Sequence, residues 1–239
     1  MLKNHKYLVI GIVSRINSDS SSDDVNCIMD DYRIAILKSG GLPILLLPPQ
    51  TIHYNPVKPR NVARLTDSEK KYLQESVNLC DGILLPGGSR WYEFDEYIYK
   101  YALQKDIPIL GICAGMQMMA CMDNNRYTTC FDTTKKNETT IEHYQKNQNY
   151  VHAIHIIEGS LLSQIIEENK IMVNSRHHYH VDRVTSLKIS AYSEDGLIEA
   201  IEDTNRTFVL GVQWHPESMI KYDENAQKLL ASFIQACQK

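Results

Sequence analysis

The sequence lacks several features that mark common classes of protein. Its six cysteines form no Cys-x-x-Cys pair, which argues against a zinc ribbon or a thioredoxin-type redox site. No apolar run approaches the ~20 residues of a membrane-spanning helix, so we expect no membrane association. Lys and Arg number 25 against 29 Asp and Glu. Without an excess of basic residues, we expect no nucleic-acid partner.

The beginning of the sequence also lacks a feature. Residues Met1–Tyr7 are polar and contain no apolar core of the kind found in a secretory signal peptide. We therefore expect a cytoplasmic protein. In that compartment the thiols stay reduced, so disulfides are not expected.

Short apolar runs alternate with segments of helical periodicity over the first half of the chain. Strands are predicted at 7–13, 43–47, 83–85 and 108–112, and helices around 25–36, 73–77, 94–101 and 116–122. This alternation is typical of a mostly parallel sheet with helices on both faces. The polar segments 48–66 and 124–150 are predicted to be loops.

The C-terminal third has a different pattern. Closely spaced strands are predicted at 151–157, 188–192, 197–201 and 208–213, before a final helix around 226–234. Asp195-Gly196 indicates a hairpin between two of these strands. With 239 residues, we expect one α/β domain spanning 1–239.

The segment Gly111-Ile112-Cys113-Ala114-Gly115 lies between a predicted strand and a predicted helix. A nucleophile flanked by glycines in this context indicates a nucleophile elbow, a tight turn that leaves no room for bulky neighbours. The helix N-terminus behind Cys113 favours a thiolate. The alternative is a buried structural cysteine beside packing glycines.

A cysteine nucleophile needs a base and a group that orients the base. His215 and Glu217 follow directly on a predicted strand, and on extended backbone they would point the same way. The alternative is a surface turn. For the developing oxyanion, the backbone amides of Gly88 and Ala114 are candidate donors. An ordinary turn at a strand end would also explain the two glycines before Ser89.

Four motifs together resemble class I glutamine amidotransferases, and within them the γ-glutamyl hydrolases of the peptidase C26 group. They are Leu85–Gly88, Gly111–Gln117, Asn174–His178 and Gly211–Glu217. The resemblance implies a flavodoxin-like three-layer α/β/α fold with a mainly parallel central sheet, extended by antiparallel strands in the C-terminal third. It also implies a Cys-His-Glu triad at Cys113, His215 and Glu217.

The resemblance further implies which residues contact the γ-glutamyl group of the substrate. These are Gln117 and, largely through backbone, Arg176, His177, His178 and Tyr179. The loop Ser89–Phe94 departs from the family pattern, in which an aspartate usually stands two residues after the glycine pair. Ala114 and Tyr179 replace the arginine and glutamine that are common there. These departures bear on the leaving amine and leave the triad intact.

The expected reaction is hydrolysis of a γ-glutamyl amide through a γ-glutamyl thioester, without a cofactor. Two alternatives stay open: a glutaminase subunit that delivers ammonia to a separate synthase, and a non-catalytic binder or redox sensor on the same scaffold. The formation of a homodimer is a further possibility that the sequence leaves undecided. Histidines cluster near 152–155 and 177–180, but no cysteine or acidic partner stands at metal-ligand spacing, so we expect no metal site.

Overall fold

The computed structural model describes residues 7–18, 21, 23–53, 64–124, 130–132 and 139–238. For residues 130–132 it describes the backbone alone. Residues 1–6, for which we predicted no signal peptide, lie outside the described ranges. Parts of the predicted loops 48–66 and 124–150 lie outside them as well.

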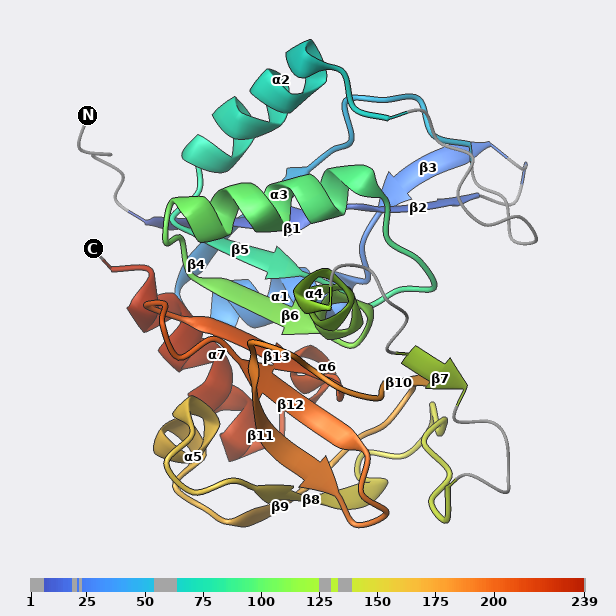
Figure 1. Ribbon diagram of the computed structural model, residues 1–239, viewed down its shortest axis with the longest axis vertical. Helices are drawn as coiled ribbons and strands as arrows, with labels where there is room; N and C mark the ends of the chain where they lie inside the picture. Colours follow the sequence, from blue (N-terminus) through green and yellow to red (C-terminus); the bar gives the residue numbers. More distant parts are fainter. Residues whose placement is uncertain are drawn as a thin grey trace.

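Five parallel strands form one half of an 11-stranded sheet (Figure 1). In spatial order they are β4 (Gly41–Leu46), β1 (Leu8–Val13), β5 (Gly82–Leu85), β6 (Ile109–Ile112) and β13 (Val209–Val212). Taken along the chain, these five strands have the spatial order 2-1-3-4-5, which is that of the flavodoxin-like fold. The predicted fold class is therefore confirmed.

Antiparallel strands extend this sheet beyond β13. They are β12 (Ile198–Glu202), β11 (Lys188–Ser193), β8 (His152–Ile156) and β9 (Lys170–Val173). Off this path, β10 (Tyr179–Val181) pairs with β12, and β7 (Cys130–Asp132) pairs with β10. The predicted hairpin at Asp195-Gly196 joins β11 to β12. Gly196 has φ 85°, a value that glycine adopts without strain.

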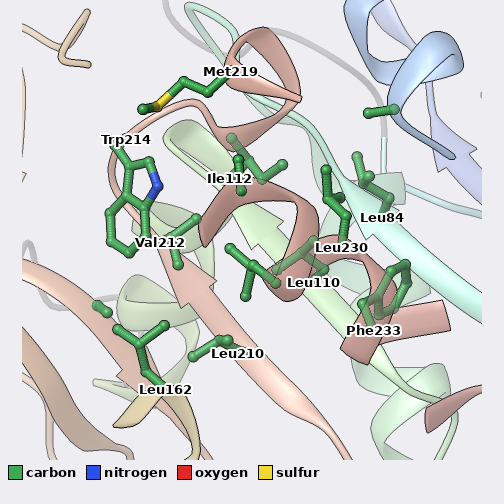
Figure 2. Packing of buried hydrophobic residues seen from close by; sticks show 14 of the residues in the cluster. Leu84, Leu110, Ile112, Leu162, Leu210, Val212, Trp214, Met219, Leu230 and Phe233 are labelled. Carbon is green, nitrogen blue, oxygen red and sulfur yellow. The ribbon is translucent and has the colours of Figure 1, made fainter. Parts of the chain in front are cut away.

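Helices cover both faces of the sheet. On one face lie α1 (Asp30–Lys38), α5 (Leu161–Ile166), α6 (Pro216–Met219) and α7 (Glu224–Ala236). On the other lie α2 (Asp67–Asn78), α3 (Glu93–Gln104) and α4 (Ala114–Asp123). Neighbouring strand residues enter opposite cores: Leu84 packs with α7 (Figure 2), whereas Leu85 packs with α3 and α4. Strands buried on both faces explain the continuous apolar runs.

The predicted helix at 25–36 is wrong in its first part. Residues Asp24–Cys27 form β3, which pairs antiparallel with β2 (Arg15–Ser18), and α1 begins only at Asp30. Two acidic residues in the first turn of α1 favour this start because they complement the helix dipole. Val25 and Ile28 fit a helical period, but pairing with β2 overrides it.

Among the described residues, no helix combines the length and the apolar character that crossing a lipid bilayer requires.

Candidate active site

The carboxyl ends of the parallel strands bring the predicted catalytic residues to one edge of the sheet. Gly87 follows β5, Cys113 follows β6, and His215 lies just beyond β13. These three strands are neighbours in the sheet, paired in parallel register. Ligand sites of open α/β sheets lie at this edge.

Cys113 occupies a strained turn between β6 and α4. Its φ of 52° and ψ of −107° lie where non-glycine residues are rare. Backbone hydrogen bonds fix the turn: Cys113 N donates to Val212 O at 2.8 Å, and Gln117 N donates to Cys113 O at 3.0 Å. A Cβ on Gly115 would lie 2.2 Å from Leu85 O, so only glycine lets α4 approach β5 this closely. The geometry is that of the predicted elbow.

Glu217 orients the His215 ring through a hydrogen bond. His215 Nδ1 lies 2.7 Å from Glu217 Oε1, and both side chains are buried. The backbone differs from the extended segment that we expected: His215 is the N-cap of α6, and Glu217 lies in the first turn of that short helix. The turn still places the two side chains together because Pro216 starts the helix directly after His215.

The electrostatics of the site favour a charged imidazole. Burial by itself would lower the pKa of His215, but the charges of Glu217 and Cys113 and hydrogen bonds to both raise this pKa to about 10. His215 is therefore an imidazolium at neutral pH. Its positive charge stabilises negative charge on the sulfur of the adjacent Cys113.

Asn174 holds the backbone of His215 on both sides. Its Oδ1 accepts from His215 N at 2.8 Å, and its Nδ2 donates to His215 O at 2.9 Å. Asn174 is fully buried. Asn174 belongs to a motif that carried the family resemblance. Its contact with His215, however, joins residues 41 positions apart, so no local sequence pattern predicted that contact.

Two further residues shape the glycine turn after β5, and no sequence motif singled them out. Tyr32 Oη accepts a hydrogen bond from Gly87 N at 2.7 Å. Arg15 donates from Nε to Gly87 O at 3.1 Å and also to Pro86 O. The Arg15 guanidinium is itself paired with the buried Asp95. These contacts fix the turn beside Cys113, where a Cβ on Gly87 would lie 2.9 Å from His215 Cε1.

A cavity of about 230 Å³ opens beside His215 and this glycine turn. The loop that departs from the family pattern contributes Ser89, Arg90 and Tyr92 to its wall. Residues of β2, β3 and the start of α1 also line the cavity, among them Asn17, Cys27 and Tyr32. Ala114 lies behind Cys113 as the first residue of α4, where helix geometry leaves its N–H without an intrahelical acceptor.

The five residues expected to contact the γ-glutamyl group lie in a different place. None of them is among the described residues that line the cavity. Gln117 Nε2 donates to Tyr179 O at 2.7 Å and to Gln213 Oε1 at 3.1 Å, while Tyr179 itself is exposed. Gln117 therefore supports the backbone that leads into β10.

The rest of this segment divides between surface and core. Arg176 donates to Ser218 Oγ at 3.1 Å, and the exposed His178 stacks on Tyr144 with ring centroids 3.8 Å apart. His177 is buried and turns inward. There it meets His143, His152 and Glu199, and the four ligand atoms lie within 4.8 Å of one another. This buried cluster could hold a metal ion.

Comparison with known proteins identifies relatives for this site. The peptidase C26 family model matches residues 92–217, which include Cys113, His215 and Glu217. A glutamine amidotransferase-like protein of Rickettsia prowazekii is 34% identical and aligns with 78% of this chain and 81% of its own length. The γ-glutamyl-γ-aminobutyrate hydrolase of Escherichia coli is 29% identical over 96% of this chain and 93% of its own.

Solved structures match the fold over nearly the whole chain. A GMP synthase subunit from Thermoplasma acidophilum has a TM-score of 0.64 at 14% identity, covering 98% of this chain and 96% of its own. The glutaminase domain of Trypanosoma brucei CTPS, with bound acivicin, has a TM-score of 0.61 at 20% identity. The match covers 96% of this chain and 93% of that domain's chain. The family model spans more than half of the sequence and ends on the Glu217 that orients His215, so this chain belongs to the peptidase C26 family.

Proposed function

We propose that this protein hydrolyses γ-glutamyl amides through a covalent thioester on Cys113. One observation carries the proposal: the buried His215–Glu217 pair, joined at 2.7 Å, stands beside a cysteine on a strained strand-to-helix turn. A nucleophile, a base and an orienting carboxylate in this arrangement are the parts that acyl transfer requires. The family membership and the E. coli hydrolase support γ-glutamyl amides as the substrate class.

The reaction follows from the protonation state of the site. The Cys113 thiolate attacks the γ-carbonyl carbon and forms a C–S bond, and the carbonyl oxygen becomes an oxyanion. The imidazolium of His215 then gives its proton to the amine nitrogen as the C–N bond breaks. The neutral His215 next takes a proton from water, which attacks the thioester, releases glutamate and restores the thiolate. Glu217 keeps the ring in one orientation throughout.

The oxyanion would be stabilised by the backbone amides of Gly88 and Ala114. Gly87 donates its own N–H to Tyr32, which leaves Gly88 as the glycine of this turn that can donate to substrate. Ala114 offers the first amide of α4, and the helix dipole adds to its effect. Arg15 keeps the turn in place through the carbonyls of Pro86 and Gly87.

The two halves of the substrate would lie on opposite sides of Cys113. The segment Arg176–Tyr179, supported by Gln117, would contact the charged head of the γ-glutamyl group, mostly through backbone. The leaving amine would occupy the cavity lined by Ser89, Arg90 and Tyr92. In this arrangement residues 1–239 act as a single domain on a small-molecule substrate, and a synthase partner is not required.

A glutamine-like electrophile tests the assignment of the nucleophile. We expect it to label wild-type protein once, at Cys113, as shown by intact mass and peptide mapping. Cys27 lines the same cavity, so Cys27→Ser is the matched control and should still be labelled, whereas Cys113→Ala should not. Labelling of Cys27 with Cys113 unmodified would overturn the proposal. Fast turnover of free glutamine, together with capture of a synthase, would instead favour the ammonia-delivering alternative.

A further inference from the structure

Three histidines and one glutamate converge in a buried pocket of side chains within the antiparallel half of the sheet. His152 comes from β8, Glu199 from β12, His177 from the segment between β9 and β10, and His143 from the segment that precedes β8. The four side chains are at most 2% exposed. The proposed reaction involves the backbone of His177 in substrate contact but none of these four side chains.

The distances around Glu199 match those of a metal coordination shell. Its Oε1 lies 3.5 Å from His177 Nε2, 3.6 Å from His143 Nδ1 and 3.7 Å from His152 Nε2. A tetrahedral zinc ion with ligand bonds of about 2.0–2.1 Å separates neighbouring ligand atoms by roughly 3.4 Å. A small contraction of the side chains would therefore enclose an ion.

Hydrogen bonds on the far side of each ring fix which nitrogen faces the centre. His143 Nε2 lies 3.1 Å from Asp195 Oδ2, and His152 Nδ1 lies 3.1 Å from the carbonyl of Ala153. His177 Nδ1 lies 3.0 Å from the carbonyl of Tyr179. Each acceptor requires a proton on the nitrogen that it contacts, so the opposite nitrogen presents a lone pair to the centre. Metal-bound histidines are oriented by carboxylate and carbonyl partners of this kind.

The centre of the cluster thus receives electron pairs and no hydrogen-bond donor. Among the described residues, His143 Nδ1, His152 Nε2 and both oxygens of Glu199 form no hydrogen bond. Buried polar atoms in this number are costly without a partner. A single proton on Glu199 could be donated to only one of these nitrogens. The remaining lone pairs on the histidine nitrogens and the carboxylate would still face one another.

The geometry points to a structural zinc site formed by His143, His152, His177 and Glu199. Imidazole nitrogen and carboxylate oxygen are both zinc ligands, and four protein ligands make a closed site, which is typical of a structural role. Asp195 would support the site by holding the His143 ring in place. The histidine clusters near 152–155 and 177–180 each supply one ligand of this site. The sequence alone led us to expect no metal because the other two ligands, His143 and Glu199, come from distant segments.

The ion would join the antiparallel strands to the wall of the active site. Ser175 Oγ donates to His143 O at 2.7 Å, and His177 N donates to the same carbonyl at 3.0 Å. Asn174, which clamps the backbone of His215, is three residues before His177. Zinc would therefore stabilise the segment 174–177 without contacting substrate.

Metal content tests the site independently of any activity. The full chain, produced without a histidine tag in zinc-supplemented medium, should contain about one zinc per chain by elemental mass spectrometry. Glu199→Gln should retain less than a tenth of that. His155→Ala is the matched control: it removes an exposed histidine from the same strand, β8, and should retain one zinc per chain.

A second measurement keeps the test valid if a variant folds poorly. Wild-type protein stripped with a chelator should melt at a lower temperature, and ZnCl₂ should restore the melting temperature at one equivalent. Asp195→Asn should weaken zinc affinity by about 10–100-fold. The proposal is overturned if wild-type protein neither retains nor takes up zinc, or if Glu199→Gln binds it as well as wild type does. A different metal, lost in the same variant, would overturn the assignment to zinc.

Discussion

At the scale of single residues, we expect the three members of the proposed triad to carry different parts of the reaction. Cys113→Ala should abolish turnover while the protein stays folded, because the backbone rather than the sulfur fixes the elbow. His215→Ala removes acid and base together and should come close to the same loss. Glu217→Gln keeps the shape of the side chain and should cost less. Steady-state kcat for the three variants, with circular dichroism as the folding control, measures this order. Near-wild-type activity of both the His215 and Glu217 variants would contradict the assignment.

The pH dependence of activity should report the charge of His215. The pKa of His215 is raised from 6.5 to about 10, with Glu217 as the main cause of the increase. Activity that needs the imidazolium should therefore persist at mildly alkaline pH and fall as pH approaches 10. Glu217→Gln should move this fall in kcat/KM to lower pH. An identical alkaline limb in wild type and variant would show that Glu217 does not support the charge.

The same shift affects stability, with a defined sign. Because the folded-state pKa of His215 lies above the unfolded value, its contribution to stability is complete below pH 6.5 and is lost as pH rises through about 10. The difference in the free energy of unfolding between wild type and Glu217→Gln should accordingly shrink over this interval. Urea unfolding at several pH values measures it.

The three residues of the proposed triad stood out in the sequence because Cys113 and the His215–Glu217 pair each follow a recognisable buried strand. Cys113 has glycines around it, and His215 and Glu217 are two residues apart. The groups that hold these residues in place could not be found in that way. Tyr32 contacts Gly87 across 55 positions of the chain, and Asn174 contacts His215 across 41. Such contacts exist only after the sheet has formed, so no local pattern marks them.

At the scale of elements, the packing of α4 against β5 depends on Gly115. Helix propensity alone predicts that Gly115→Ala would stabilise the protein by about 1 kcal/mol. The new Cβ, however, would lie 2.2 Å from Leu85 O, a backbone atom that cannot move without β5. We expect a net destabilisation of about 1–3 kcal/mol. Urea unfolding decides between the two effects, and an unchanged or increased stability would show that α4 does not pack as closely as described.

Elements that are buried on both faces were predictable, and short paired elements were not. β1, β5 and β6 appear in the sequence as continuous apolar runs because parallel strands between two helical layers have no polar face. β2 and β3 pair with each other outside the main sheet. Most of their residues are exposed or half-buried, so the sequence shows no clear alternation of apolar and polar residues there. β10 has three residues and α6 has four, too few for a period to be recognised.

At the scale of the whole molecule, we propose that the cavity beside His215 sets the choice of leaving amine. Arg90 lies in its wall with Tyr92, and a cation there favours an amine that carries a carboxylate or an apolar body. We expect higher kcat/KM for γ-glutamyl amides of acidic or neutral amines than for those of cationic amines. In Arg90→Glu this ratio should fall. Lys188→Glu makes the same charge change on β11 and should leave it unaltered. A wild-type preference for the cationic substrate would contradict the prediction.

The central claim for the molecule is that the strand edge forms one catalytic site with Cys113 as the covalent nucleophile. It is tested most directly by acid quenching of wild-type protein during turnover of a γ-glutamyl amide, followed by mass spectrometry of its peptides. We predict that the peptide containing Cys113 gains the mass of one γ-glutamyl group, and that the gain is reversed by hydroxylamine, as expected of a thioester. Steady turnover with this peptide unmodified, or with the adduct on another residue, would contradict the account.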